Sequence, residues 1–213
     1  MRIFVSLHQI FDNIEMLEVK DATIAIGERC LATGLSFMAR DGQLTCITGP
    51  AGSGKTTLLR TLMGFLPVSQ GFVSVDGELL TVHSAHAFRT LMAYLPQQMQ
   101  QLGHQLTPPE APLLEAEDYG VWNPGLPKAA EAEQAAELSP FDIYRLVEQI
   151  LLEAADKQII VADEPAARLT PELEQRMLDL LRRQAVAGKT VLIASRRPLL
   201  VNSADQVIEL KSE

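Results

Sequence analysis

Residues 49–56 read Gly49-Pro50-Ala51-Gly52-Ser53-Gly54-Lys55-Thr56, and Thr57 follows them. This run matches the pattern G-x-x-x-x-G-K-[ST] at every fixed position. A buried apolar strand is predicted at 43–48, immediately before the loop, and a helix is predicted at 55–63 after it. A glycine-rich loop between a strand and a helix is typical of a site that binds phosphate groups.

The residue types in this loop suit phosphate chemistry. Glycines let successive backbone N–H groups turn toward a phosphate without a Cβ in the way, and the following helix adds the positive end of its dipole. Lys55 can reach the β- and γ-phosphates of a nucleotide, and the Thr56 hydroxyl can bind Mg²⁺. We therefore predict that ATP and Mg²⁺ bind at Gly49, Pro50, Ala51, Gly52, Ser53, Gly54, Lys55, Thr56 and Thr57.

A second acidic anchor for the metal is expected farther along the chain. The apolar run at 159–162 is predicted to be a strand, and it ends in Asp163 and Glu164. We expect Asp163 to hold Mg²⁺ through a water ligand and Glu164 to polarise the water that attacks the γ-phosphate. Two acids at a strand end carry little information alone, but they gain it from the phosphate loop upstream.

Composition and charge limit the other classes of function. The chain has 213 residues, of which 47% are hydrophobic, enough to fill the core of one large domain. A formal net charge of −9 argues against a broad nucleic-acid-binding face. The two cysteines, Cys30 and Cys46, lack metal-like spacing and are expected to be buried thiols in a reducing compartment.

The sequence contains no apolar run approaching the roughly 20 residues of a membrane helix, and its N-terminus does not read as a secretion signal. We therefore expect a soluble cytoplasmic protein that would need a partner to reach a membrane. Residues 1–15 stand apart, and two interpretations are open. They form a short amphipathic helix, or Met16 is the natural start and they extend the gene model.

The remaining pattern alternates short strands and helices, which predicts an α/β fold with a largely parallel sheet covered on both faces. Domain boundaries follow from composition: an α/β core at 16–97 and 158–213, and a proline-rich, mostly helical insertion at 98–157. Within the insertion, the last helix begins at Ser139 and Pro140. The other predicted strands are 17–20, 35–38, 71–75, 78–80 (after the turn Asp76-Gly77), 92–95, 158–162, 190–194 and 206–210, with a helix capped by Thr170 from Pro171 to Gly188.

From Met16 to Glu213 the sequence resembles the ATP-binding domains of ABC transporters, within the P-loop NTPase superfamily. The resemblance rests on Leu17-Glu18-Val19-Lys20, the loop at 49–57, Leu95-Pro96-Gln97 and Ala162-Asp163-Glu164-Pro165, in the family's order. It implies a P-loop NTPase sheet with flanking helices, an N-terminal antiparallel β subdomain and a shortened helical subdomain. It also implies that Gln97 contacts the metal and the attacking water and begins the segment that meets a membrane partner.

Four positions depart from the family's pattern. The place of the Leu-Ser-Gly-Gly-Gln signature reads Leu138-Ser139-Pro140-Phe141-Asp142, and Asp142 puts a negative charge near the expected phosphate. Arg196 stands at the switch-histidine position, Thr170 replaces an aspartate after the acidic pair, and Ile26 replaces the aromatic that stacks on adenine. Together these changes suggest slow or partner-dependent hydrolysis.

Three hypotheses about function follow from the sequence. The first is the energising subunit of an ABC-type transport system, held at the inner face of the membrane by a transmembrane permease and paired with a like or unlike ATP-binding subunit. The second is a catalytically weak regulatory subunit that pairs with a more typical ABC ATPase. The third is a small-molecule kinase, disfavoured because 98–157 offers few of the arginines that a substrate lid would need.

Overall fold

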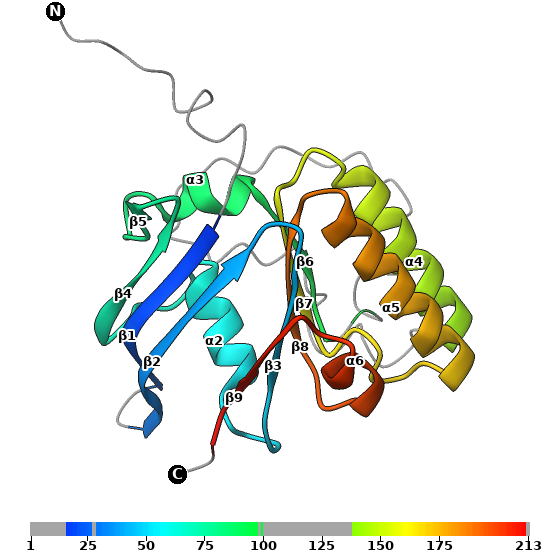
Figure 1. The fold of residues 1–213 in the computed structure, drawn as a ribbon, viewed down its shortest axis with the longest axis horizontal. Helices are drawn as coiled ribbons and strands as arrows, with labels where there is room; N and C mark the ends of the chain where they lie inside the picture. Colours follow the sequence, from blue (N-terminus) through cyan, green and yellow to red (C-terminus); the bar gives the residue numbers. More distant parts are fainter. Residues whose placement is uncertain (1–15, 27–28, 98, 100–137, 212–213) are drawn as a thin grey trace, which may run out of the picture.

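The computed structural model describes residues 16–26, 29–97, 99 and 138–211. The helix considered within 1–15 and most of the predicted insertion at 98–157 therefore lie outside the described residues. In the described chain, an antiparallel sheet lies on one side, a parallel sheet in the middle and helices on the far side (Figure 1).

The middle layer is a five-stranded parallel sheet in the order β6-β7-β8-β3-β9. Its strands are β3 (Leu44–Thr48), β6 (Met92–Leu95), β7 (Ile159–Asp163), β8 (Thr190–Ala194) and β9 (Gln206–Glu209). Every residue of β7 and β8 is buried, as expected for strands that are covered on both faces. This arrangement confirms the predicted parallel sheet and brings the ends of β3, β7 and β8 to one edge.

The outer sheet is antiparallel and has the order β2-β1-β4-β5. Its strands are β1 (Met16–Ile26), β2 (Arg29–Arg40), β4 (Gln70–Val75) and β5 (Glu78–Leu79). The predicted turn Asp76-Gly77 joins β4 and β5, with φ angles of 51° and 82° that suit a tight hairpin. The predicted antiparallel β subdomain is confirmed.

Helix α2 (Lys55–Leu62) lies between the two sheets and buries six of its residues. Leu58, Leu59 and Leu62 are almost completely buried in a cluster that includes Leu17 and Val19 of β1 and Val161 of β7. Burying a leucine side chain stabilises a fold by about 1.5–3 kcal/mol. The helix that follows the phosphate loop is therefore fixed by packing on both sides.

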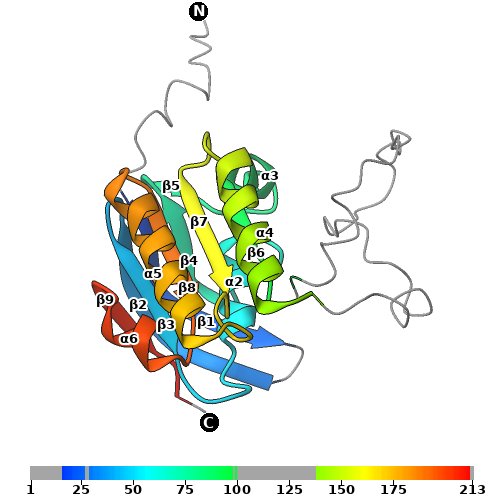
Figure 2. The ribbon, with the colours of Figure 1, turned by 90° about the vertical axis from the view of Figure 1, so that its right-hand side faces the viewer.

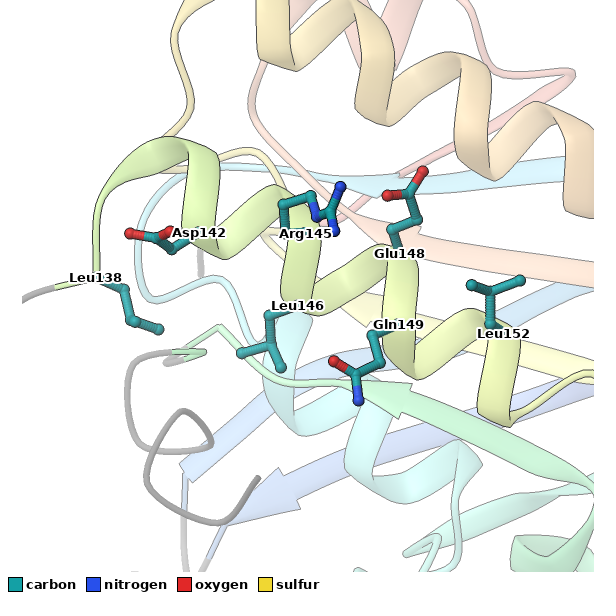
Figure 3. Close-up of a pocket in the computed structure, with 7 residues that line it drawn as sticks. All are labelled: Leu138, Asp142, Arg145, Leu146, Glu148, Gln149 and Leu152. Atoms are coloured by element: carbon teal, nitrogen blue, oxygen red, sulfur yellow. The ribbon is translucent and has the colours of Figure 1, made fainter. Parts of the chain in front are cut away.

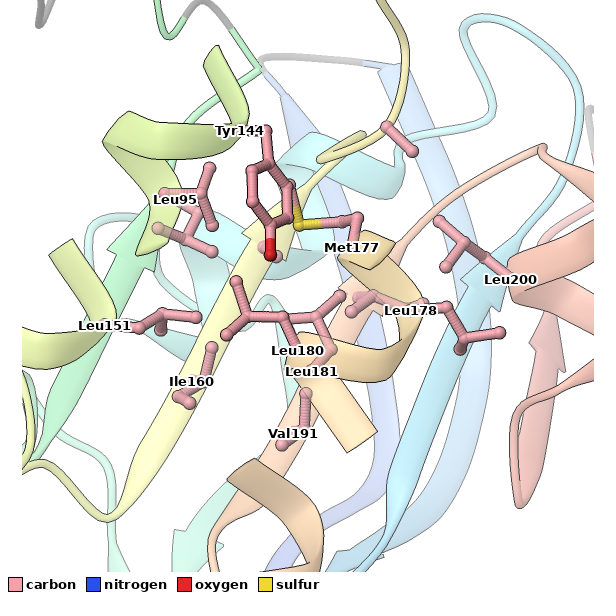
Figure 4. Packing of buried hydrophobic residues seen from close by; sticks show 14 of the residues in the cluster. Leu95, Tyr144, Leu151, Ile160, Met177, Leu178, Leu180, Leu181, Val191 and Leu200 are labelled. Atoms are coloured by element: carbon pink, nitrogen blue, oxygen red, sulfur yellow. The ribbon is translucent and has the colours of Figure 1, made fainter. Parts of the chain in front are cut away.

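The other face of the parallel sheet is covered by α4 (Pro140–Glu153), α5 (Pro171–Val186) and α6 (Pro198–Asn202), as the side view in Figure 2 also shows. Figure 4 shows Met177, Leu180 and Leu181 of α5 beside Ile160 of β7 and Val191 of β8. Tyr144 and Leu151 of α4 join the same cluster. The apolar faces of these helices account for the second core.

Several elements differ from the sequence prediction. The first two strands were predicted at 17–20 and 35–38, whereas β1 and β2 run for 11 and 12 residues. Their alternation is interrupted by register shifts and by Asp21, whose φ is 47°, so the sequence pattern looks shorter than the strands are. The short helices α3 (Ala85–Thr90) and α6 were not predicted. Within the described residues, no helix combines the length and apolarity needed to cross a bilayer.

Candidate phosphate-binding site

The glycine-rich loop connects the end of β3 to the start of α2, as predicted. Gly49 has a φ of 144°, and a Cβ there would lie 2.4 Å from the carbonyl oxygen of Leu210 and 2.8 Å from Ser53 Oγ. Gly54 has a φ of 93° and immediately precedes α2. No side chain caps this helix, so amides of its first turn remain available to an anion.

Lys55 folds back over its own loop. Its Nζ donates hydrogen bonds to the carbonyl oxygens of Gly49, at 2.9 Å, and Pro50, at 3.0 Å. Burial lowers the pKa of this ammonium group, and the nearby Glu164 carboxylate works in the opposite direction. Phosphate oxygens can replace these carbonyls as stronger, charge-assisted acceptors.

The loop and the acidic end of β7 meet through one hydrogen bond. Thr56 Oγ1 donates to Asp163 Oδ2 over 2.7 Å, although the two residues are 107 positions apart in the chain. In the sheet, β7 and β3 flank β8, so the strand order brings the residues that follow β3 close to the end of β7. A hydroxyl and a carboxylate at this separation form a pair of oxygen ligands of the kind that Mg²⁺ prefers.

The surroundings of Asp163 disfavour its charged form. It is 1% exposed, and burial raises the pKa of its carboxyl group, while the Thr56 hydrogen bond works against that shift. Its second oxygen, Oδ1, and the Ser53 hydroxyl are buried without a hydrogen-bond partner among the described residues. A buried unpaired carboxylate oxygen is costly, and a divalent cation would satisfy it. The donor set therefore fits magnesium together with nucleotide oxygens.

Glu164 follows directly and is held in an unusual backbone conformation. Its φ is 47°, a region that non-glycine residues rarely adopt, and its N–H donates to the Ala194 carbonyl of β8 over 2.8 Å. The residue is buried. Its position one residue beyond β7 places it beside the phosphate loop, where its charge acts on Lys55.

Arg196 contacts Glu164, which the sequence analysis did not foresee. Its Nε lies 3.4 Å from Glu164 Oε1, while 57% of the arginine side chain is exposed. From the sequence, Arg196 was noted only as the residue at the switch-histidine position. The sequence signal was present in the two basic residues after β8, but their partners depend on the path of the loop.

Gln97 lies just past the end of β6 and is exposed. No hydrogen bond connects its side chain to Asp163 or Glu164 in the described part of the chain. Thr57, the last loop residue in the prediction, is buried in the first turn of α2, and its carbonyl accepts a hydrogen bond from Thr61 Oγ1 at 3.0 Å. The structure thus brings together the loop, Asp163 and Glu164, while Gln97 follows β6, the strand that pairs with β7.

The segment at the signature position begins α4. Ser139 is the N-cap, and its Oγ accepts from the Asp142 amide at 3.2 Å. Asp142 Oδ2 in turn accepts from the Ser139 amide at 3.2 Å and from the Ser139 hydroxyl at 2.6 Å. This reciprocal arrangement is a capping box. The carboxylate of Asp142 therefore occupies the helix end that a phosphate would otherwise use.

A separate cavity of about 400 Å³ runs along α4 (Figure 3). Among the described residues, its lining consists of Leu138, Asp142, Arg145, Leu146, Glu148, Gln149 and Leu152. None of these residues comes from the phosphate loop or from the end of β7. The cavity is therefore a feature of the helical layer and not an extension of the phosphate site.

Comparison with known proteins identifies the family. The family model described as "ABC transporter" matches residues 32–162. The chain belongs to the ABC transporter family. Within it, this chain is a nucleotide-binding domain of the P-loop NTPase type.

Curated relatives agree with this assignment. The thiamine import ATP-binding protein ThiQ of Ruegeria sp. is 34% identical over 209 residues, which cover 91% of this chain and 87% of that protein. The Nod factor export ATP-binding protein I of Ralstonia nicotianae is 30% identical over 84% of this chain. The chain spans 59% of the length of that protein and 24% of an ABC transporter ATP-binding/permease protein of Mycobacterium tuberculosis.

Solved structures show the same fold. A nucleotide-free ATP-binding cassette from an ABC transporter matches with a TM-score of 0.66 and 24% identity, over 92% of this chain and 88% of that one. A bacterial Atm1-family ABC exporter with ATP bound matches with a TM-score of 0.69 and 18% identity, over 94% of this chain and 38% of that one. The domain thus shares its fold with both isolated cassettes and a larger transporter.

Proposed function

We propose that this domain binds Mg-ATP and couples its binding and hydrolysis to a transmembrane permease, as the ATP-binding subunit of an ABC-type transport system. The observation that carries the proposal is the 2.7 Å hydrogen bond between Thr56 Oγ1 and Asp163 Oδ2. It joins the two parts of the chain that a Mg-nucleotide site needs, namely the phosphate loop and an acid at the end of a neighbouring strand.

Each site residue has a proposed role that follows from its chemistry. Residues 49–57 surround the phosphates with backbone amides, and the Lys55 ammonium leaves its loop carbonyls to bind phosphate oxygens. Thr56 and Asp163 would hold Mg²⁺, which would supply charge neutralisation on the phosphates. Glu164 orients the attacking water and accepts its proton as the bond between the γ-phosphorus and the bridging oxygen breaks, giving ADP and phosphate. Gln97 would contact the metal and the attacking water.

The proposed assembly contains the permease and a second ATP-binding subunit, at the inner face of the membrane. In this assignment, residues 16–97 and 158–213 form the ATP-binding core, and 98–157 form a reduced helical subdomain whose described part contains α4. The capping box of Ser139 and Asp142 supports an unlike partner for this chain, because a helix end that carries its own carboxylate repels a phosphate from a neighbour.

A second candidate is a catalytically weak, regulatory nucleotide-binding subunit. Two contacts favour it: the capping box at the signature position and the Arg196 side chain near Glu164. A guanidinium in contact with the Glu164 carboxylate competes with the attacking water for the same oxygen. This candidate predicts ATP binding without turnover by the purified chain.

ATP hydrolysis by the purified chain, with and without a typical ABC ATPase partner, separates the two candidates. The matched variant is Glu164→Gln, which keeps the side-chain size but removes the carboxylate. The energising subunit predicts a turnover at least about a hundredfold above that of the variant, because general base catalysis contributes 10²–10⁴-fold. Equal background rates in wild type and variant under both conditions would support the regulatory candidate.

A further inference from the structure

Arg197, the second of the two arginines after β8, reaches across to the turn that follows Glu164. Its Nη2 donates to the Ala167 carbonyl oxygen over 2.8 Å, and its Nη1 lies 3.6 Å from Glu174 Oε2. Ala167 lies in the turn between β7 and α5, and Glu174 lies in the first turn of α5. One guanidinium group therefore connects the end of β8, the turn and the start of the helix.

The arginine itself is well anchored at its backbone. Its N–H donates to Ser195 Oγ over 3.1 Å, and Ser195 is fully buried, with its own N–H bonded to the Ile47 carbonyl of β3 at 3.0 Å. Glu174 is buried as well, and its side chain is 10% exposed. A buried carboxylate needs a partner, and Arg197 supplies the cation. Arg197, the Ala167 carbonyl and Glu174 thus form a clamp that joins the end of β8 to the start of α5.

The turn needs such support. It comprises residues 164–170 and begins with Glu164, whose φ of 47° is energetically unfavourable and persists only when the surroundings hold it. Within the turn, the Ala167 N–H donates to the Glu164 carbonyl at 3.0 Å, and the Leu169 N–H donates to the Ala166 carbonyl at 3.2 Å. Arg197 binds the carbonyl of Ala167, whose N–H makes the first of these two bonds.

Arg196 and Arg197 act on different parts of the same turn. Arg196 approaches the Glu164 carboxylate with a largely exposed side chain and a long 3.4 Å contact, which suits a group that can move away. Arg197 makes the shorter contact with the backbone and also meets a buried acid. A bidentate, planar guanidinium can bridge a carbonyl and a carboxylate, and a lysine cannot reproduce that geometry.

We propose that Arg197 is a positioning residue for ATP hydrolysis: by clamping the 164–170 turn to β8 and α5, it holds Glu164 in its working conformation. The proposal rests on the proposed function, because it assigns Glu164 the role of the base. It predicts that the loss of Arg197 lowers the rate of the chemical step without weakening nucleotide binding, since no residue of the clamp belongs to the phosphate loop.

The test combines hydrogen exchange with kinetics on the full chain and its Arg197→Gln, Arg197→Lys and Glu174→Gln variants. Arg176→Gln, which changes an exposed arginine on the same helix α5, is the matched control. In Arg197→Gln, the Ala167 and Leu169 amides should exchange about tenfold faster or more, while amides of β7 keep their wild-type rates. The kcat should fall by about tenfold or more with KM for Mg-ATP unchanged, because a small misplacement of a catalytic group slows chemistry. Arg197→Lys should restore part of both effects.

The outcomes of this test decide the proposal as follows. Exchange at Ala167 and Leu169 that matches the Arg176→Gln control overturns the clamp, whether or not ATP is hydrolysed. Faster exchange with unchanged kcat overturns the positioning role and leaves a structural contact. If Arg197→Gln does not fold, Glu174→Gln, which removes the ion pair but keeps the bond to Ala167, must show the same pattern to a smaller degree. Wild-type turnover equal to that of Glu164→Gln contradicts the proposed hydrolysis instead, and the exchange rates still decide the clamp.

Discussion

At the scale of single residues, two side chains of the phosphate loop already have hydrogen-bond partners within the protein. Lys55 binds two carbonyl oxygens of its loop, and Thr56 binds Asp163, so both side chains are positioned before any nucleotide arrives. Binding then exchanges the neutral carbonyl acceptors of Lys55 for charged phosphate oxygens and does not need to order a free side chain. Charge-assisted hydrogen bonds are roughly twice as strong as neutral ones, which gives this exchange its direction.

Gly49 and Gly52 offer a prediction at the residue scale, because the two glycines differ in the free space around their Cα atoms. Both have a positive φ, but a Cβ on Gly52 meets nothing within 4 Å, whereas a Cβ on Gly49 collides with the Leu210 carbonyl. Gly52→Ala should cost about 1–2 kcal/mol of stability through backbone strain. Gly49→Ala should cost about 1–3 kcal/mol more, because the backbone must shift. Urea unfolding of the two variants measures the difference, and equal losses would show that the close approach at Gly49 is unimportant.

At the scale of elements, α4 begins with a capping box that the sequence only partly announced. Ser139 and Pro140 marked the helix start, but the second half of the box is Asp142, which was expected only to place a negative charge near a phosphate. Ser139→Ala should lower the unfolding free energy by about 1 kcal/mol, the usual value of an N-cap. Thermal unfolding measures this loss. Ser203→Ala, which changes a serine outside α4, is the control. A stability equal to that of the control would contradict the cap.

The junction between α5 and β9 predicts a dependence of stability on pH. Asp205 Oδ2 accepts from Arg182 Nη1 at 2.6 Å and from the Leu44 amide at 2.8 Å. The hydrogen bond from Arg182 is the main reason that the pKa of Asp205 lies below its usual range. A depressed pKa in the folded state means that the stabilisation is present above the unfolded pKa and is lost as the pH falls through the folded one.

Asp205→Asn should therefore lower the melting temperature at pH 7. The unfolding free energy should fall by an amount on the order of 1 kcal/mol, after allowance for the partial exposure of this side chain. The difference from wild type should shrink below about pH 4, where the carboxylate of the unfolded chain is protonated. Asp179→Asn on the exposed face of α5 is the control. A difference that stays constant from pH 7 to acid pH would contradict the assignment of this effect to the carboxylate charge.

The strands of the parallel sheet could be predicted because each is a short apolar run, and β6 and β8 have the predicted bounds. Helices α3 and α6 could not, since 6 and 5 residues are too few to establish a helical period. Their existence depends on packing, for example of Phe88 and Leu200 in the two cores. Element type was thus readable where local pattern and burial agree, and not where tertiary contacts decide.

At the scale of the whole molecule, strand order converts two distant motifs into one place. The order β7-β8-β3 puts the ends of β3 and β7 on either side of β8, which brings Thr56 to Asp163. The approach of Thr56 to Asp163 could be predicted from the sequence, because a phosphate loop needs an acidic residue as a second anchor for its metal. The contacts of Arg196 with Glu164 and of Arg197 with Ala167 were not, because they depend on the path of a loop after β8 that follows no periodic pattern. The roles assigned to Gln97, Glu164 and the other site residues stay predictions.

The central claim is that the loop at 49–57 and Asp163 form one Mg-ATP site, and equilibrium binding of ATP tests it most directly. The measurement uses the full chain with and without Mg²⁺, and the Lys55→Ala variant, with Lys157→Ala as a control that removes a lysine from outside the site. We predict binding that strengthens with Mg²⁺ and weakens by about ten- to a hundredfold in Lys55→Ala, because one charge-assisted contact to phosphate contributes about 1.5–3 kcal/mol. Equal affinity of wild type, Lys55→Ala and Lys157→Ala, with no effect of Mg²⁺, would contradict it.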